Sequence, residues 1–268
     1  MERTTDGQIR IGIMDSGIGG FSILAEIHQL LPGVEISYFA DDKNAPYGNL
    51  SSEAVVEHTR AAIQALIGQG AELIVLACNS ATAVAIDQMR TEFQIPFVGV
   101  EPYVNVIHKQ SFDLSKDRIG ILTTTMTGES KRFKQLLDRF DPNGHLHAYK
   151  SPHLAQLIEQ LFKHGWEKDI TDKIIDELSF VKTSGLTHLI LGCTHYPLIG
   201  EFIDREFDLK VISPCPHVAR RVKELLPNLD DTMKKVTTFN FYSSIRASWV
   251  EQNFSSLLGA LRPLPKRV

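Results

Sequence analysis

Short apolar runs alternate with amphipathic segments along the first hundred residues of the chain. The apolar runs are rich in β-branched residues and predict four strands, at 9–14, 34–41, 71–78 and 96–102. The segments between them have helical periodicity, at 21–33, 53–69 and 79–93, the last with Asn79 or Ser80 as its expected N-cap. Strands that alternate with helices predict a parallel sheet with helices on both faces.

The same pattern restarts in the second half of the chain. Residues 117–130 repeat the strand, small polar loop and helix of residues 9–20, and 187–195 repeat the hydropathy of 72–80. The spacing from Gly12 to Gly120 is similar to that from Cys78 to Cys193, which indicates a coarse duplication. The predicted fold is therefore α/β, with two pseudo-symmetric units of mostly parallel sheets and flanking helices.

The C-terminal segment has no obvious place in the second unit. It opens with a strand and a helix around "KVISPCPHVARRVKELL" and then reads as less regular. We expect it to return to the first unit. This predicts a first domain of 1–102 plus 214–268 and a second domain of 103–213.

Composition limits the classes of function. The 268 residues are 43% hydrophobic and 22% charged, as in ordinary globular proteins. The net charge of −4 makes a nucleic-acid partner unlikely by bulk electrostatics. No apolar run approaches the roughly 18 residues of a membrane span, and the first ten residues lack the apolar core of a signal peptide. We expect a cytoplasmic protein that does not bind membranes.

The chain has three cysteines, and two of them occupy matching settings. Cys78 in "LACNSAT" and Cys193 in "LGCTHYP" each follow a predicted strand. The three are far apart and form no CxxC pair, which argues against a disulfide framework or a metal site. Each is either a buried filler or a reactive thiol. Cys215 has no counterpart in the repeat and is expected to be structural.

Ligands of open α/β sheets bind beyond the carboxyl ends of the strands. If the two units face each other, their loops line one cleft, with Cys78 and Cys193 on opposite walls. A helix N-terminus beside a cysteine can lower the pKa of its thiol. The pair could be a redox disulfide, a nucleophile with His195 as base, or two acid/base groups on opposite faces of a carbon atom.

The loop "DSGIGG" at 15–20 is less specific. Its glycines fit either a phosphate-binding loop or a tight strand–helix turn, and no nucleotide-binding motif accompanies it. Asp15 and Ser16 could simply be helix caps, and Tyr47 could be a packing residue.

Taken together, several stretches resemble the cofactor-independent aspartate/glutamate racemase family, and within it the enzymes acting on glutamate. The resemblance runs over about 9–226 and is carried by "DSGIGG" (15–20), "PYG" (46–48), "ACNSAT" (77–82), "TTTMT" (123–127) and "LGCTHYP" (191–197). It implies interconversion of L- and D-glutamate without cofactor or metal, to supply D-glutamate for peptidoglycan, by a homodimer. Aspartate as substrate and a non-catalytic role such as gyrase inhibition are the alternatives.

The resemblance also assigns roles to residues. The thiolate of Cys78 takes the α-proton of D-glutamate and that of Cys193 takes it from L-glutamate, while the opposite thiol returns a proton. Asp15 and His195 match residues that assist the thiols, and Glu159 matches a further acid on a looser local similarity. The positions implied to hold the substrate are Asp15, Ser16, Pro46, Tyr47, Gly48, Cys78, Asn79, Ser80, Thr124, Thr127, Cys193, Thr194 and His195.

Overall fold

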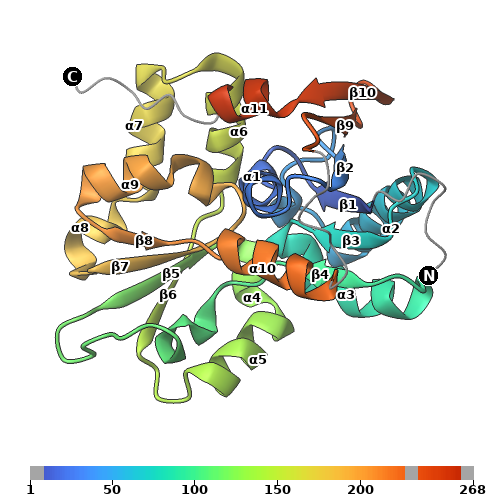
Figure 1. The fold of residues 1–268 in the computed structure, drawn as a ribbon. Helices are drawn as coiled ribbons and strands as arrows, with labels where there is room; N and C mark the ends of the chain where they lie inside the picture. The colour runs from blue at the N-terminus through green and yellow to red at the C-terminus, as the bar shows by residue number, and fades with distance from the viewer. Residues whose placement is uncertain (1–8, 227–234, 261–268) are drawn as a thin grey trace.

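A computed structural model describes residues 9–226 and 235–260 of the chain. Its strands form two sheets, which lie on the right and left of Figure 1. The first sheet contains β1 (Arg10–Asp15), β2 (Glu35–Ala40), β3 (Leu73–Leu76), β4 (Phe97–Gly99), β9 (Thr238–Ser243) and β10 (Ser248–Asn253). The second contains β5 (Ile119–Thr123), β6 (Leu146–Lys150), β7 (His188–Gly192) and β8 (Lys210–Ile212).

The two sheets repeat one topology. The first has the order β10-β9-β2-β1-β3-β4, and the second has β6-β5-β7-β8. All neighbours pair in parallel except the antiparallel β9 and β10. The four strands β2-β1-β3-β4 therefore correspond in order and direction to β6-β5-β7-β8. This confirms the predicted α/β fold class with two similar, mostly parallel units.

Helices cover both faces of the first sheet. One face packs against α1 (Phe21–Leu30), α10 (Cys215–Leu225) and α11 (Phe254–Ala260), and the other against α2 (Ser52–Gly68) and α3 (Asn79–Glu92). Strand β3 shows why: Leu73 and Val75 enter the first core, while Ile74 and Leu76 enter the second. Every residue of β3 is buried, as expected for a strand covered on both sides.

The second sheet is covered in the same way. One face packs against α6 (Leu154–His164), α7 (Lys168–Glu177), α8 (Phe180–Ser184) and α9 (Gly200–Phe207). The other packs against α5 (Lys131–Phe140) and the 3₁₀ turn η2 (Val104–His108), while α4 (Thr125–Glu129) follows β5. Two more 3₁₀ turns, η1 (Tyr47–Asn49) and η3 (Tyr196–Ile199), lie in loops after strands.

The segment after α10 differs from its prediction. We expected it to be less regular, but β9 and β10 form a hairpin that extends the first sheet beside β2. The missed signal is the alternation in "TFNFYS", where Phe239 is buried and Asn240 is exposed. Within the described residues, no helix is both long and apolar enough to span a bilayer.

Candidate active site

The two cysteines occupy equivalent positions in the two sheets. Ile11 of β1 pairs with Leu73 of β3, and Ile119 of β5 pairs with His188 of β7. Cys78 follows Leu73 at the same spacing at which Cys193 follows His188. Both thiols are free and buried, with exposed fractions of 5% and 4%. The carboxyl ends of β3 and β7 therefore present matching thiols.

Cys193 contacts an imidazole, which in turn contacts a carboxylate. His195 Nδ1 lies 3.8 Å from the Sγ of Cys193, and its Nε2 lies 2.8 Å from Glu159 Oε1. Burial opposes the imidazolium, but hydrogen bonds with Cys193 and Glu159 raise the pKa of His195 well above its usual value. Burial likewise opposes ionisation of Glu159, yet its pKa is lowered because His195 donates to it. The pair therefore carries opposite charges and places an imidazolium beside the thiol.

Glu159 also ties the two units together. Its Oε1 accepts a hydrogen bond of 2.9 Å from the backbone N–H of Ile18 in the "DSGIGG" loop. A Cβ on Gly17 would overlap this oxygen, and one on Gly19 would overlap His195 Nδ1. Neither glycine has a positive φ. These glycines are needed for the close approach of the second unit, and not for the backbone conformation of a tight turn.

Asp15 ends β1 and is fully buried. Its Oδ1 accepts the N–H of Gly17 at 2.8 Å, and its Oδ2 accepts the hydroxyl of Thr194 at 3.1 Å. Burial raises the pKa of Asp15, while His195 and the N–H of Gly17 act in the opposite direction. Asp15 is therefore a second acid that contacts both units.

Cys78 is the N-cap of α3, in place of the expected Asn79 or Ser80. Its Sγ lies 3.7 Å from the hydroxyl of Ser16. Burial, with the charges of Asp15 and Cys193, raises the pKa of the Cys78 thiol to about 12. The N–H of Ala81 in the first turn of α3 lowers this pKa, as a helix N-terminus can, but desolvation outweighs it.

Hydroxyl groups line the start of α3 and the loop after β5. Ser80 Oγ lies 3.1 Å from Thr124 Oγ1, which donates to Thr127 Oγ1 at 3.1 Å. Thr124 is also the N-cap of α4. Both polar atoms of the Asn79 side chain are buried without a hydrogen-bond partner. Buried polar groups without a partner are uncommon in folded proteins.

The "PYG" stretch lies at the edge of this cluster. The Ala45–Pro46 peptide is cis. The buried Tyr47 donates its hydroxyl to Asp41 Oδ2 at 2.7 Å, and a Cβ on Gly48 would come within 3.1 Å of Thr124 Cβ. Gly48 thus adjoins the hydroxyl cluster, whereas the hydroxyl of Tyr47 binds within its own unit.

Sequence reasoning missed three polar residues around the site. Asp41 follows β2 directly, so its place after a strand was an available signal. Tyr38 donates to the carbonyl of Gly17 at 2.8 Å. Ser22 donates to the carbonyl of Thr194 at 3.0 Å and accepts the thiol of Cys215 at 3.3 Å, so the third cysteine has a partner near the site. No pattern in the sequence marks Tyr38 or Ser22.

The arrangement brings two thiols, two carboxyl groups and an imidazole into one buried, polar region. The His195 imidazole lies beside Cys193, while the raised pKa of Cys78 keeps that group a neutral thiol. A thiolate and a thiol form a base and an acid for one proton exchange. Among the described residues, no group of three or more His, Cys, Asp or Glu side chains is placed to hold a metal ion.

Known proteins resemble this chain in sequence and fold. The sequence model of the Asp/Glu/Hydantoin racemase family matches residues 11–222. A glutamate racemase from Clostridium botulinum (strain Kyoto / Type A2) is 35% identical over 238 residues, covering 86% of this chain and 90% of that protein.

Solved structures agree with these sequence matches. Escherichia coli glutamate racemase, in complex with L-glutamate and the activator UDP-MurNAc-ala, has a TM-score of 0.76 at 26% identity, covering 88% of this chain and 89% of that one. The Francisella tularensis enzyme in complex with D-glutamate has a TM-score of 0.72 at 26% identity, covering 88% of each chain. The chain belongs to the Asp/Glu/Hydantoin racemase family.

Proposed function

We propose that this chain is a glutamate racemase, an isomerase that interconverts L- and D-glutamate through two thiols and without a cofactor. The observation that carries the proposal is the equivalent placement of Cys78 and Cys193 after β3 and β7. The glutamate racemase names of the C. botulinum and E. coli relatives support glutamate as substrate. Neither aspartate nor gyrase inhibition is favoured by these relatives.

We propose the following proton transfers. The thiolate of Cys193, stabilised by the imidazolium of His195, removes the α-proton of L-glutamate and becomes a thiol. The thiol of Cys78 then gives its proton to the opposite face of the carbanion and becomes a thiolate. The product is D-glutamate, and the reverse reaction starts from the Cys78 thiolate. This exchange requires both thiols to lie within reach of one carbon atom.

The remaining groups fit the three charges of glutamate. Hydroxyl and amide groups of Asn79, Ser80, Thr124, Thr127 and Thr194 can bind the two carboxylates. The buried Asp15 can pair with the ammonium, and a positive charge there would lower the cost of a thiolate on Cys78. The proposed substrate site also includes Ser16, Pro46, Tyr47 and Gly48. The hydroxyl of Tyr47 is hydrogen-bonded to Asp41.

Four polar contacts join the two units across this site. They are Ile18 to Glu159, Ser22 to Thr194, Thr194 to Asp15, and Ser80 to Thr124. Because both thiols are buried, we propose that these contacts open to admit glutamate. We also propose that the units are the domains 1–102 plus 214–268 and 103–213, although 1–8, 227–234 and 261–268 lie outside the described residues.

We further propose a cytoplasmic homodimer that supplies D-glutamate for peptidoglycan. The reaction itself is tested by circular dichroism of purified protein with L-glutamate, D-glutamate or L-aspartate. We expect the signal of either glutamate enantiomer to decay to zero. Decay of the signal with aspartate alone would show that the protein is a racemase whose substrate is aspartate. No decay with any substrate, in folded and reduced protein, would refute the racemase.

A further inference from the structure

Helix α3, which has Cys78 as its N-cap, contacts the second unit at two points. Near its start, Ser80 Oγ lies 3.1 Å from Thr124 Oγ1. Two turns later, Asp87 Oδ1 and Oδ2 lie 3.1 and 3.0 Å from Nη1 of Arg132 on α5. Residues two turns apart face the same side of a helix, separated by about 10 Å along its axis. Two such contacts restrain the tilt of α3, and not only its position.

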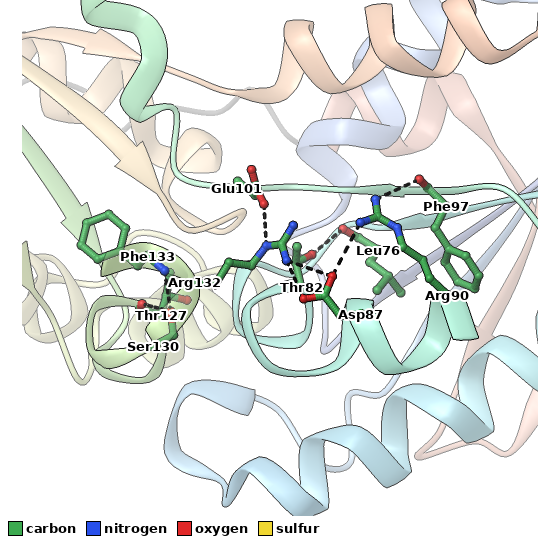
Figure 2. Close-up of polar contacts among 10 residues, drawn as sticks. All are labelled: Leu76, Thr82, Asp87, Arg90, Phe97, Glu101, Thr127, Ser130, Arg132 and Phe133. Atoms are coloured by element: carbon green, nitrogen blue, oxygen red, sulfur yellow. Dashed lines mark hydrogen bonds and ion pairs between the residues drawn. The ribbon is translucent and has the colours of Figure 1, made fainter. Parts of the chain in front are cut away.

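Arg132 also contacts the segment through which the chain passes from the first sheet to the second. Its Nε donates to Glu101 Oε1 at 2.5 Å, and Glu101 follows β4. Figure 2 shows the guanidinium reaching between Glu101 and Asp87. One side chain therefore joins α5, α3 and the connection between the two sheets.

The N-terminus of α5, the helix that carries Arg132, is hydrogen-bonded to the hydroxyl cluster of the site. Ser130 donates to the carbonyl of Thr127 at 2.7 Å and caps α5 by accepting the N–H of Phe133 at 3.1 Å (Figure 2). Thr127 in turn donates its N–H to Thr124 Oγ1 at 3.3 Å. A shift of α5 relative to α3 would therefore be transmitted to both Thr124 and Cys78.

The ion pairs of Arg132 contribute little to the stability of the fold. The side chains of Arg132, Glu101 and Asp87 are 25%, 33% and 80% exposed. Ion pairs at such exposures add little to the stability of a fold. The planar guanidinium nevertheless fixes direction, because its Nε points to Glu101 and its Nη1 to Asp87. The proposed reaction needs one thiol from each unit at the same carbon atom. Its rate therefore depends on how the two thiols are oriented relative to each other.

We propose that Arg132 is a positioning residue of the racemase, which sets the alignment of Cys78 with Cys193 by holding α3 and Glu101 against α5. The inference rests on the proposed function. It assigns to a residue outside the thiol site a role in the rate of proton transfer.

Arg60 provides a matched control. Its Nε and Nη2 pair with the two oxygens of Glu92 on α3, at 2.7 and 2.9 Å, and its side chain is 22% exposed. Arg60 lies on α2, so this pair stays within the first unit. Arg132→Ala and Arg60→Ala each remove an arginine–carboxylate ion pair from α3, but only the first removes a contact of α3 with the second unit.

The experiment compares kcat/KM for L-glutamate, the melting temperature and the dependence of kcat/KM on NaCl from about 0.05 to about 0.5 M. We expect Arg132→Ala to lower kcat/KM at least about tenfold and to flatten its salt dependence. Arg60→Ala should keep kcat/KM within about twofold, with the wild-type salt dependence, at a similar melting temperature. Arg132→Lys, which keeps the charge but not the planar guanidinium, should fall between them.

A charge exchange adds an independent readout. Arg132→Glu and Glu101→Arg should each lower kcat/KM, and the double variant should recover at least about threefold over either one. Equal kcat/KM and equal salt dependence for Arg132→Ala and Arg60→Ala would overturn the proposal. If Arg132→Ala does not fold, the same comparison with Arg132→Lys decides. An inactive wild type would instead refute the proposed function.

Discussion

Glu159 Oε1 lies 2.8 Å from His195 Nε2, and the two residues come from different elements of the second unit, α6 and the loop after β7. The same oxygen accepts the N–H of Ile18 from the first unit. One carboxylate thus orients the imidazolium beside Cys193 and contacts the opposite wall of the site.

Glu159→Gln is expected to lower kcat for glutamate by about 10–100-fold, because a neutral amide no longer stabilises the imidazolium of His195. The pKa of His195 should fall, and the activity should depend more strongly on pH near neutrality. Rates in both directions across a pH series, together with imidazole titration by NMR, measure this. Glu129→Gln, which removes an exposed partner of Lys150, is the control. An unchanged pH profile in Glu159→Gln would contradict the assignment.

Cys78 should titrate far above an ordinary thiol in the free protein, since its pKa is raised to about 12. Because the folded pKa is raised, the neutral thiol stabilises the fold fully below the unfolded pKa of about 8.5. That stabilisation is lost as the pH rises toward 12. The difference in thiolate absorbance between wild type and Cys78→Ser reports the titration. A Cys78 midpoint below about 9 would show that burial does not control this group.

Gly17→Ala should disturb Glu159 without touching either thiol, because a Cβ at position 17 would overlap Glu159 Oε1. We expect a loss of about 1–3 kcal/mol in the free energy of unfolding and a lower kcat. Gly68→Ala is the matched control, since nothing lies within 4 Å of a Cβ there. Equal stability and activity in the two variants would mean that the loop and Glu159 do not approach closely in solution.

Cys215→Ala is expected to leave racemisation within a few-fold of wild type while lowering stability by about 0.5–1.5 kcal/mol, the usual value of one hydrogen bond. Its thiol donates to Ser22, which lies outside the proposed proton path. Cys215→Ser, which restores a donor, should recover part of the stability. Denaturant unfolding and steady-state rates measure both effects. Loss of activity as severe as in Cys78→Ala would assign Cys215 to the chemistry.

Local patterns predicted much of this molecule. The strand–helix alternation and the repeat of "ELIVLACNS" in "THLILGCTH" indicated two similar sheets, and the ladder register now explains the repeat. Cys78 and Cys193 could be found because a strand end, a thiol and a small polar loop recur together. The hairpin β9–β10 was missed because its alternation is short and its outer strand is largely exposed.

The contacts between the two units could not be predicted from the sequence. The contacts of Glu159 with Ile18 and of Ser22 with Thr194 join residues far apart in sequence, and no local pattern encodes them. The raised pKa of Cys78 follows from burial close to Asp15 and Cys193, which a strand–helix junction alone does not reveal. The role of the glycines in "DSGIGG" required the position of the opposite wall.

The most direct test of the two-thiol account follows the deuterium in D₂O at early conversion of L-glutamate. The Cys78 thiol exchanges with solvent before turnover, whereas Cys193 carries away the substrate proton. We predict that the first D-glutamate formed is deuterated at the α-carbon while the remaining L-glutamate stays protiated, as measured by NMR and chiral chromatography. D-glutamate that keeps the original proton, or equal early deuteration of both enantiomers, would contradict two thiols acting on opposite faces of one carbon atom.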